Sequence, residues 1–268
     1  MKFSVNGQEV FAATGGKPFD PTLPLLVFIH GAGMDHSVWQ QQARYFAHHG
    51  YAVLAVDLPA HGRSKGAPLD NIAKQADWIV DTIVSVGASS ASLVGHSMGA
   101  LAALDAASRH SNQVDILALL GVGGEMPVHP DLLDAAAAND HKAIDIIADW
   151  AHGRRAHRGG NISPGIWLIN VGTRLLESAR PGILGTDLAA ADAYKRALDA
   201  AANVKCPTLC LLGAQDKMTP IRAALPLVEA ISNVKKVVLP DTGHMMMAEA
   251  PGATLNALID FLDVEVTI

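Results

Sequence analysis

The sequence lacks the long hydrophobic runs and the basic character that mark two large classes of protein. Its longest apolar runs are far shorter than the roughly 20 residues that a membrane span needs. Residues 1–7 have no apolar core of the secretory type, so no secretory leader is expected. The formal net charge is −6, whereas a nucleic-acid binder normally presents a basic face. The sequence therefore predicts neither a membrane span nor a nucleic-acid partner.

Cysteine is also scarce, since the chain contains only Cys206 and Cys210. If both lie on one strand, a rise of about 3.3 Å per residue places them roughly 13 Å apart, which is too far for a disulfide. No histidine or further cysteine clusters around them, so we expect packing thiols and no metal site. This cysteine usage predicts a protein of the reducing cytoplasm.

Charged residues make up only 17% of the chain, while half of the residues are hydrophobic. A chain of this composition can bury enough apolar surface to fold, so disorder is not expected. Its 268 residues are enough for one domain with a substantial core, or for such a domain with an insertion.

Short apolar runs and helix-forming stretches alternate along most of the chain. The runs typical of strands are 25–29, 51–56, 91–94, 114–120, 208–212 and 234–239. The stretches that favour helices are 37–49, with Ser37 as the expected N-cap, and 71–86, 100–107, 187–202, 220–231 and 253–262. Before all of them, an Asn6-Gly7 turn predicts a hairpin. The alternation predicts an α/β fold with a mostly parallel sheet, whose ligands bind beyond the carboxyl ends of the strands.

The alternation stops between residues 125 and 185. Helical pieces are expected here at 132–138, 141–152 and 166–176, with no strand between them. The segment is too short to bury a large core of its own, so we expect it to lie against the sheet as a lid. The remaining residues, 1–124 and 186–268, would then form the core of the fold.

The pentapeptide Gly95-His96-Ser97-Met98-Gly99 lies where a predicted strand meets a predicted helix. A turn this sharp forces its central residue into a strained, left-handed conformation, and the flanking glycines remove side chains that would clash. The turn exposes the Ser97 hydroxyl and leaves the Met98 N–H at a helix N-terminus, which favours negative charge. Such a G-x-S-x-G turn is a hydrolase signature. The alternative is a glycine-bounded turn that carries a solvated serine.

A serine nucleophile needs a base within hydrogen-bonding reach, and the base needs an acid to orient it. Asp216 and His244 each follow a predicted strand, and the chain order serine, acid, histidine is the order of hydrolases with this architecture. Glu125, which follows the strand at 114–120, is the second choice for the acid.

Five motifs, each at a predicted strand end, resemble those of the α/β-hydrolase superfamily. They are the His-Gly loop at 30–33, Asp-x-x-x-His-Gly-x-Ser at 57–64, the turn at 95–99, Gly-x-x-Asp-x-x-x-Pro at 213–220, and the Gly-His block that ends in Glu249-Ala250-Pro251. The resemblance covers nearly the whole chain. It implies the α/β-hydrolase fold, a mostly parallel central sheet flanked by helices, with residues 125–185 as a helical cap.

The resemblance also implies a role for particular residues. Ser97 would be the nucleophile, His244 the base and Asp216 the acid. In this superfamily the residue after the His-Gly pair supplies a backbone donor to the oxyanion. That residue is Ala32 here, and its amide would act beside the amide of Met98.

Other residues near these motifs are candidates for a substrate pocket. They are His30, Gly31, His96, Met245 and Trp167. Four of them have a structural alternative. His30 is expected to pin its loop rather than act as a base. His96, Met245 and Trp167 can line the pocket or fill the core and lid.

These observations predict a cofactor-independent serine hydrolase that acts on a small or medium ester or lactone and on water. Dehalogenases and epoxide hydrolases of this fold use an aspartate where Ser97 stands, which disfavours both. Carbon–carbon bond hydrolases and cofactor-free perhydrolases use the same three residue types and remain alternatives. A non-catalytic sensor of small molecules is the alternative from another class. The sequence leaves the substrate and the oligomeric state open.

Overall fold

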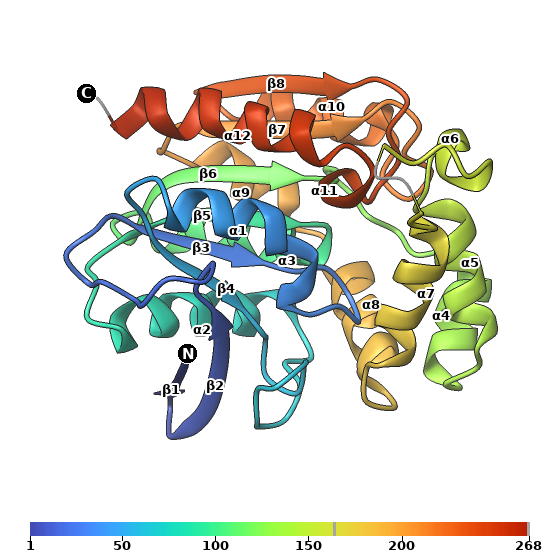
Figure 1. Ribbon diagram of the computed structural model, residues 1–268, viewed down its shortest axis with the longest axis horizontal. Coiled ribbons are helices and arrows are strands. Elements are labelled where there is room, and N and C mark those ends of the chain that lie inside the picture. Colours follow the sequence, from blue (N-terminus) through green and yellow to red (C-terminus); the bar gives the residue numbers. More distant parts are fainter. Residues whose placement is uncertain (163–164, 267–268) are drawn as a thin grey trace.

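Eight strands form one sheet across the middle of the molecule (Figure 1). The computed structural model describes residues 1–162 and 165–266, with side chains as far as residue 262. The strands are β1 (Lys2–Val5), β2 (Gln8–Ala13), β3 (Leu25–Ile29), β4 (Ala52–Val56), β5 (Ala91–His96), β6 (Val114–Leu120), β7 (Thr208–Gly213) and β8 (Val234–Leu239). Their order in the sheet is β1-β2-β4-β3-β5-β6-β7-β8. β1 and β2 form the predicted antiparallel hairpin. The six strands β4-β3-β5-β6-β7-β8, in their order across the sheet, are parallel to their neighbours.

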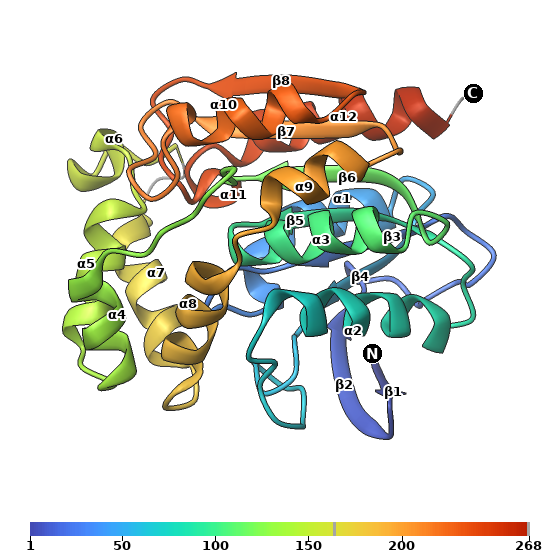
Figure 2. The same ribbon diagram turned by 180° about the vertical axis from the view of Figure 1, so that it is seen from behind.

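Both faces of the sheet are covered by helices, as the buried apolar strands require. Figures 1 and 2 show α1 (Gln40–Ala47) and α12 (Pro251–Val266) on one face, and α2 (Ile72–Ser85), α3 (Met98–Arg109), α9 (Ala197–Asn203) and α10 (Ile221–Ala230) on the other. In β3, Leu26 and Phe28 belong to one apolar cluster, whereas Val27 and Ile29 belong to the other. Successive side chains of a strand point to opposite faces, so one strand contributes to both cores.

Two helix starts show how side chains cap the first turn. Asn71 caps α2, because its side chain accepts a hydrogen bond from the Lys74 N–H at 2.9 Å. The first helix instead begins with a 3-10 turn, His36–Trp39, and its cap is Asp35. The prediction of Ser37 was wrong because the Asp35 carboxylate accepts from the Ser37 N–H at 2.8 Å.

The helices between β6 and β7 gather beyond the carboxyl ends of the parallel strands (Figure 1). They are α4 (Pro130–Ala137), α5 (Lys142–Trp150), α6 (Arg154–His157), α7 (Leu168–Glu177) and α8 (Ile183–Ala193), followed by α9. We call α4 to α8 with their connections the helical segment. Residues 163 and 164 of the predicted insertion lie outside the described residues. Within the described ranges, no helix combines the length and the hydropathy that crossing a membrane would require.

The stretch 187–202 was expected to form one helix but contains parts of two, because α8 and α9 are separated at residues 194–196. The predicted boundary after residue 185 falls inside α8. At the break, Tyr194 adopts an extended conformation and its hydroxyl donates a 2.8 Å hydrogen bond to Asp105 on α3. This bond fixes the point where the chain leaves the helical segment and returns to the sheet.

The packing of α3 on β5 predicts the effect of a single methyl group. A Cβ atom at Gly95 would lie 2.4 Å from the Gly99 carbonyl oxygen and 2.7 Å from the Ala100 Cα. We expect Gly95→Ala to lower the free energy of unfolding by about 1–3 kcal/mol, because backbone atoms must move to admit the methyl group. Gly252→Ala is the matched control, since nothing lies within 4 Å of its Cβ position. Urea unfolding of both variants tests this, and equal effects would contradict it.

Candidate active site

Ser97 lies at the turn between β5 and α3 in the strained conformation that the sequence predicted. Its φ of 54° and ψ of −119° are rare for a residue with a side chain. The Ser97 N–H donates a 2.9 Å hydrogen bond to the Leu120 carbonyl on the neighbouring strand β6. A Cβ atom at Gly99 would lie 2.4 Å from the His30 carbonyl oxygen, so only glycine allows α3 to start this close to β3. The turn is therefore fixed by the sheet on both sides.

Ala32 and Met98 line the same cavity as Ser97. Neither backbone N–H has a hydrogen-bond acceptor among the described residues. The Gly31 carbonyl oxygen is 2.8 Å from His30 Nδ1. Because a peptide group is planar, holding the Gly31 carbonyl also sets the direction of the Ala32 N–H. These two free amides can hold a negative charge that develops near Ser97.

The His30 ring is buried and connects two loops. Its Nε2 accepts from the Leu58 N–H at 3.2 Å, so Nδ1 carries the proton that is donated to Gly31. Burial lowers the pKa of His30 to about 4, which keeps the ring neutral. These contacts confirm the loop-pinning role expected of His30.

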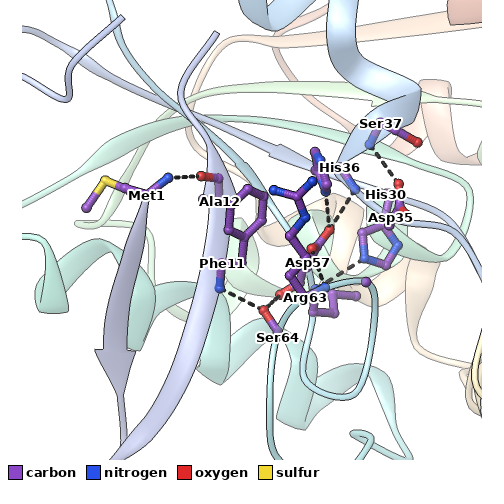
Figure 3. A network of polar contacts seen from close by, with 12 residues as sticks. Met1, Phe11, Ala12, His30, Asp35, His36, Ser37, Asp57, Arg63 and Ser64 are labelled. Carbon is purple, nitrogen blue, oxygen red and sulfur yellow. Dashed lines mark hydrogen bonds and ion pairs between the residues drawn. The ribbon is translucent and has the colours of Figure 1, made fainter. Parts of the chain in front are cut away.

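The loop after β4 is held by the carboxylate of Asp57 (Figure 3). Asp57 accepts from the N–H and Nδ1 of His36, at 2.8 and 2.7 Å, and from the Arg63 N–H at 2.8 Å. Asp35, His36 and Asp57 are the one cluster among the described residues that could hold a metal ion, because their potential ligand atoms lie within 4.8 Å of one another. The hydrogen bonds already occupy both oxygens of Asp57, so the loop is held without a cation.

Asp216 and His244 meet at the same edge of the sheet, from the loops after β7 and β8. Asp216 Oδ2 lies 2.8 Å from His244 Nδ1, and both side chains are buried. Burial by itself raises the pKa of Asp216, but the charge of His244 and the hydrogen bonds from His244 and Thr219 outweigh it and lower this pKa below its ordinary value. The pair is therefore built to hold Asp216 ionised, facing the Nδ1 of His244.

Thr219 is a member of this group that the sequence reasoning missed. Its N–H donates to Asp216 Oδ1 at 2.8 Å, and its hydroxyl donates to Asp216 Oδ2 at 2.7 Å. The same hydroxyl lies 3.2 Å from His244 Nδ1. The signal was the Asp-x-x-Thr spacing, because an aspartate often accepts from the residues that follow it in a turn.

His244 also contacts the two strands nearest to Ser97. The His96 ring lies 4.6 Å from the His244 ring, and His96 Nε2 is 3.0 Å from the His244 carbonyl oxygen. Burial lowers the pKa of His96 to about 3, so this ring is a neutral donor. At the end of β6, a Cβ atom on Gly121 would lie 2.9 Å from His244 Cε1. The imidazole of His244 therefore packs against residues at the ends of β5 and β6.

The loop of His244 is tied to the helical segment by Glu249, from α11 (Met246–Glu249). Glu249 accepts from the Gly153 N–H at 2.8 Å and from the Gly243 N–H at 3.0 Å. The His244 N–H donates to the Ala151 carbonyl at 2.8 Å. Burial raises the pKa of Glu249. The sequence showed Glu249 as part of a motif but gave no sign of these partners.

Ser97 opens into a cavity of about 570 Å³ between the sheet edge and the helical segment. Most of its lining is apolar. The lining residues are Ala32, Ser97, Met98, Met126, Pro127, Val128, His129, Pro130, Leu132, Trp150, Leu188, Ala191, Lys217, Met218 and Thr219. A cavity of this size and character suits a small organic molecule.

The residues predicted to line a pocket lie elsewhere. His30, Gly31 and His96 are buried, and none of them lines this cavity. Met245 lines two smaller cavities, and Trp167 is 60% exposed. The path of the helical segment decides the lining, and periodicity in the sequence does not reveal that path.

Glu125, the second choice for the acid, is exposed. It precedes the cavity-lining residues 126–130, but the hydrogen-bond partners of the His244 ring in the described chain are Asp216 and Thr219. The structure therefore brings Asp216, and not Glu125, to the imidazole.

Several known proteins are similar to this chain over most of its length. The chain is 30% identical over 258 residues to 2-succinyl-6-hydroxy-2,4-cyclohexadiene-1-carboxylate synthase of Escherichia coli, covering 90% of this chain and 95% of that protein. It is 28% identical to a pimeloyl-[acyl-carrier protein] methyl ester esterase of Chromobacterium violaceum, covering 90% and 95%. The enol-lactonase of Burkholderia xenovorans has the same fold, with a TM-score of 0.87 at 21% identity over 98% of this chain and all of that one.

The model of one protein family matches residues 26–258, which include most of β3, the Ser97 turn, Asp216 and His244. Together with the eight-stranded sheet, this match establishes that the chain belongs to the alpha/beta hydrolase family.

Proposed function

We propose that the protein is a serine hydrolase that cleaves a small or medium ester or lactone through an acyl-enzyme. Ser97 would be the nucleophile, His244 the base and Asp216 the acid that orients it. The observation that carries the proposal is the 2.8 Å contact between Asp216 Oδ2 and His244 Nδ1 at the edge of the sheet where Ser97 turns. An acid on Nδ1 leaves Nε2 free to accept a proton.

In this mechanism the Ser97 hydroxyl attacks the carbonyl carbon while His244 takes the hydroxyl proton. The Ala32 and Met98 amides stabilise the oxyanion, and Asp216 stabilises the imidazolium. His244 then gives the proton to the leaving alkoxide, and the carbon–oxygen bond breaks to form the acyl-enzyme. Water, activated by His244, hydrolyses this ester, so the products are the acid and the free enzyme. In a lactone, the carboxylic acid and the alcohol that form remain in one molecule.

Two observations support the ester or lactone class. The cavity of about 570 Å³ is largely apolar, and Ser97, Ala32 and Met98 are among its lining residues. The family relatives include an esterase that acts on a methyl ester and, by fold, an enol-lactonase, according to their names.

We further propose that residues 125–185 form a cap over a hydrolase core formed by 1–124 and 186–268. Support comes from the cavity, whose wall is formed by residues 126–130, Leu132 and Trp150 of this segment, by Leu188 and Ala191 of α8, and by the loops that follow the strands. Such a cap excludes water and so strengthens the electrostatic interactions at the oxyanion.

Ser97→Ala tests the nucleophile. We expect hydrolysis of short p-nitrophenyl esters to fall by about 10⁶-fold, because no other group can form the acyl-enzyme. A fluorophosphonate probe should label the wild-type protein, and Ser97→Ala should abolish the labelling. Turnover by the variant at the wild-type rate would refute the assignment. A folded wild-type protein that the probe does not label would favour a non-catalytic binder.

Asp216→Asn and Glu125→Gln form a matched pair that tests the acid. We expect Asp216→Asn to lower kcat by about 10³–10⁴-fold, because the amide no longer holds the imidazole in its productive tautomer. Glu125→Gln should leave kcat near the wild-type value, since this side chain is exposed and does not contact His244. Steady-state kinetics decides between them, and the reverse ranking would move the acid to Glu125.

Gly121→Ala tests whether the seat of His244 matters for catalysis. The added methyl group would meet His244 Cε1 at 2.9 Å and Nδ1 at 3.0 Å, at a φ of +60°. We expect kcat to fall by about 10-fold or more, because small displacements of a catalytic group are costly. Gly87→Ala carries the same backbone strain at φ +86° with nothing within 4 Å. If both variants keep wild-type kcat, the imidazole position does not limit the reaction.

A further inference from the structure

A second buried histidine–carboxylate pair lies outside the proposed mechanism. His61 comes from the loop after β4, and Asp187 comes from α8 in the helical segment, 126 residues away in the chain. His61 Nε2 lies 2.8 Å from Asp187 Oδ2, and the two side chains are 2% and 1% exposed. An isolated buried charge is strongly unfavourable, so a pair that the fold keeps in this place needs an explanation.

The hydrogen bonds favour a charged pair. His61 Nδ1 faces the Pro59 carbonyl oxygen at 3.0 Å, while Nε2 faces the Asp187 carboxylate. With Asp187 ionised, both partners are acceptors, so both ring nitrogens donate. Burial lowers the pKa of His61, but the hydrogen bond and the charge of Asp187 outweigh it and raise this pKa above its ordinary value.

Other ionisable groups lie near the pair. The neutral ring of His30 lies 4.7 Å from the ring of His61, and the Asp57 carboxylate adds a second negative charge nearby. Arg180, from the connection between α7 and α8, donates to the Ser64 carbonyl oxygen of the same loop at 3.0 Å. The imidazolium of His61 is thus balanced by carboxylates within the protein.

Asp187 has a further partner that connects it to the candidate active site. Its Oδ2 also accepts from the Gly33 N–H at 2.8 Å. Gly33 directly follows Ala32, so this bond fixes the peptide group on one side of the Ala32 Cα. His30 fixes the peptide group on the other side, through the Gly31 carbonyl. With both planes held, the direction of the Ala32 N–H is fixed.

We propose that Asp187 is a positioning residue: paired with His61, it ties α8 to the loop of Ala32 and so holds the Ala32 amide where the oxyanion forms. The inference rests on the proposed function. Asp187 Oδ1 is buried without a hydrogen-bond partner in the described chain. Such an oxygen lowers stability. A purely structural tie would not need a buried carboxylate with one unpaired oxygen. This carboxylate fits a role in orienting the loop, so that the Ala32 N–H points correctly only while α8 is docked.

Asp187→Asn is the direct test, because it keeps the shape and removes the charge. We expect kcat to fall by about 10-fold to about 100-fold, as for a small displacement of a catalytic group. KM should change by less than about 2-fold, because the oxyanion donor contacts mainly the transition state. Affinity for a trifluoromethyl ketone, which forms an oxyanion on Ser97, should weaken in parallel with kcat/KM. His61→Gln should act in the same direction.

The matched control is Glu177→Gln, which breaks another histidine–carboxylate pair of the helical segment. Glu177 Oε1 lies 2.9 Å from His141 Nε2, but His141 is 54% exposed and neither residue lines the Ser97 cavity. We expect this variant to retain wild-type kcat. Melting temperatures of all variants are measured alongside the kinetics, and His61→Gln carries the test where Asp187→Asn does not fold.

The outcomes separate the two proposals. If a fluorophosphonate labels Ser97 and the Asp187→Asn variant keeps wild-type kcat and inhibitor affinity while only its melting temperature falls, the positioning role is refuted and the proposed function stands. If Ser97 does not react and Ser97→Ala keeps full activity, both are refuted. A fall in kcat with unchanged KM, absent from Glu177→Gln, supports the inference.

Discussion

The close approach of α3 to β5 and to the end of β3 is the constraint on which the candidate site depends. Neither Gly95 nor Gly99 has room for a side chain, so the chain must reverse direction at Ser97. A left-handed residue costs about 1–2 kcal/mol, and it persists only where the surroundings leave no alternative. Here the sheet supplies those surroundings, through the bond from Ser97 to Leu120. The position of Ser97 at the cavity and the free Met98 amide are both consequences of this packing.

Buried carboxylates place the remaining parts of the site around this turn. Asp57 folds the loop after β4, Asp216 orients His244, Glu249 holds the His244 loop, and Asp187 holds the loop of Ala32. Each accepts at least one backbone N–H, and such bonds to a charged acceptor are stronger than neutral ones. Loops have few apolar contacts of their own, so these bonds take over the role that core packing plays in the sheet.

The sheet and the residues on its strand ends could be predicted because they depend on local pattern. The strands at 114–120 and 234–239 have the predicted bounds, and Asp216 and His244 follow strands as expected. The cavity lining and the His61–Asp187 pair could not be predicted in this way. They depend on where α8 docks, and contacts between residues 126 positions apart leave no periodic signal in one sequence. Apolar residues such as Trp167 fit either a buried or an exposed position of the helical segment.

The two ties of the helical segment have a consequence for how this fold can change its substrate. Glu249 joins Gly153 of the segment to the His244 loop, and Asp187 of the segment joins the Ala32 loop. The segment that shapes the cavity therefore also holds both loops on which the proposed chemistry depends. Substitutions on the cavity wall, as at Trp150, can alter the space for a substrate without disturbing these bonds. A movement of α8 or of the end of α5 would also displace the Ala32 loop or the His244 loop. Substrate selectivity can therefore vary through side chains of the cavity wall only while the backbone of the segment stays docked.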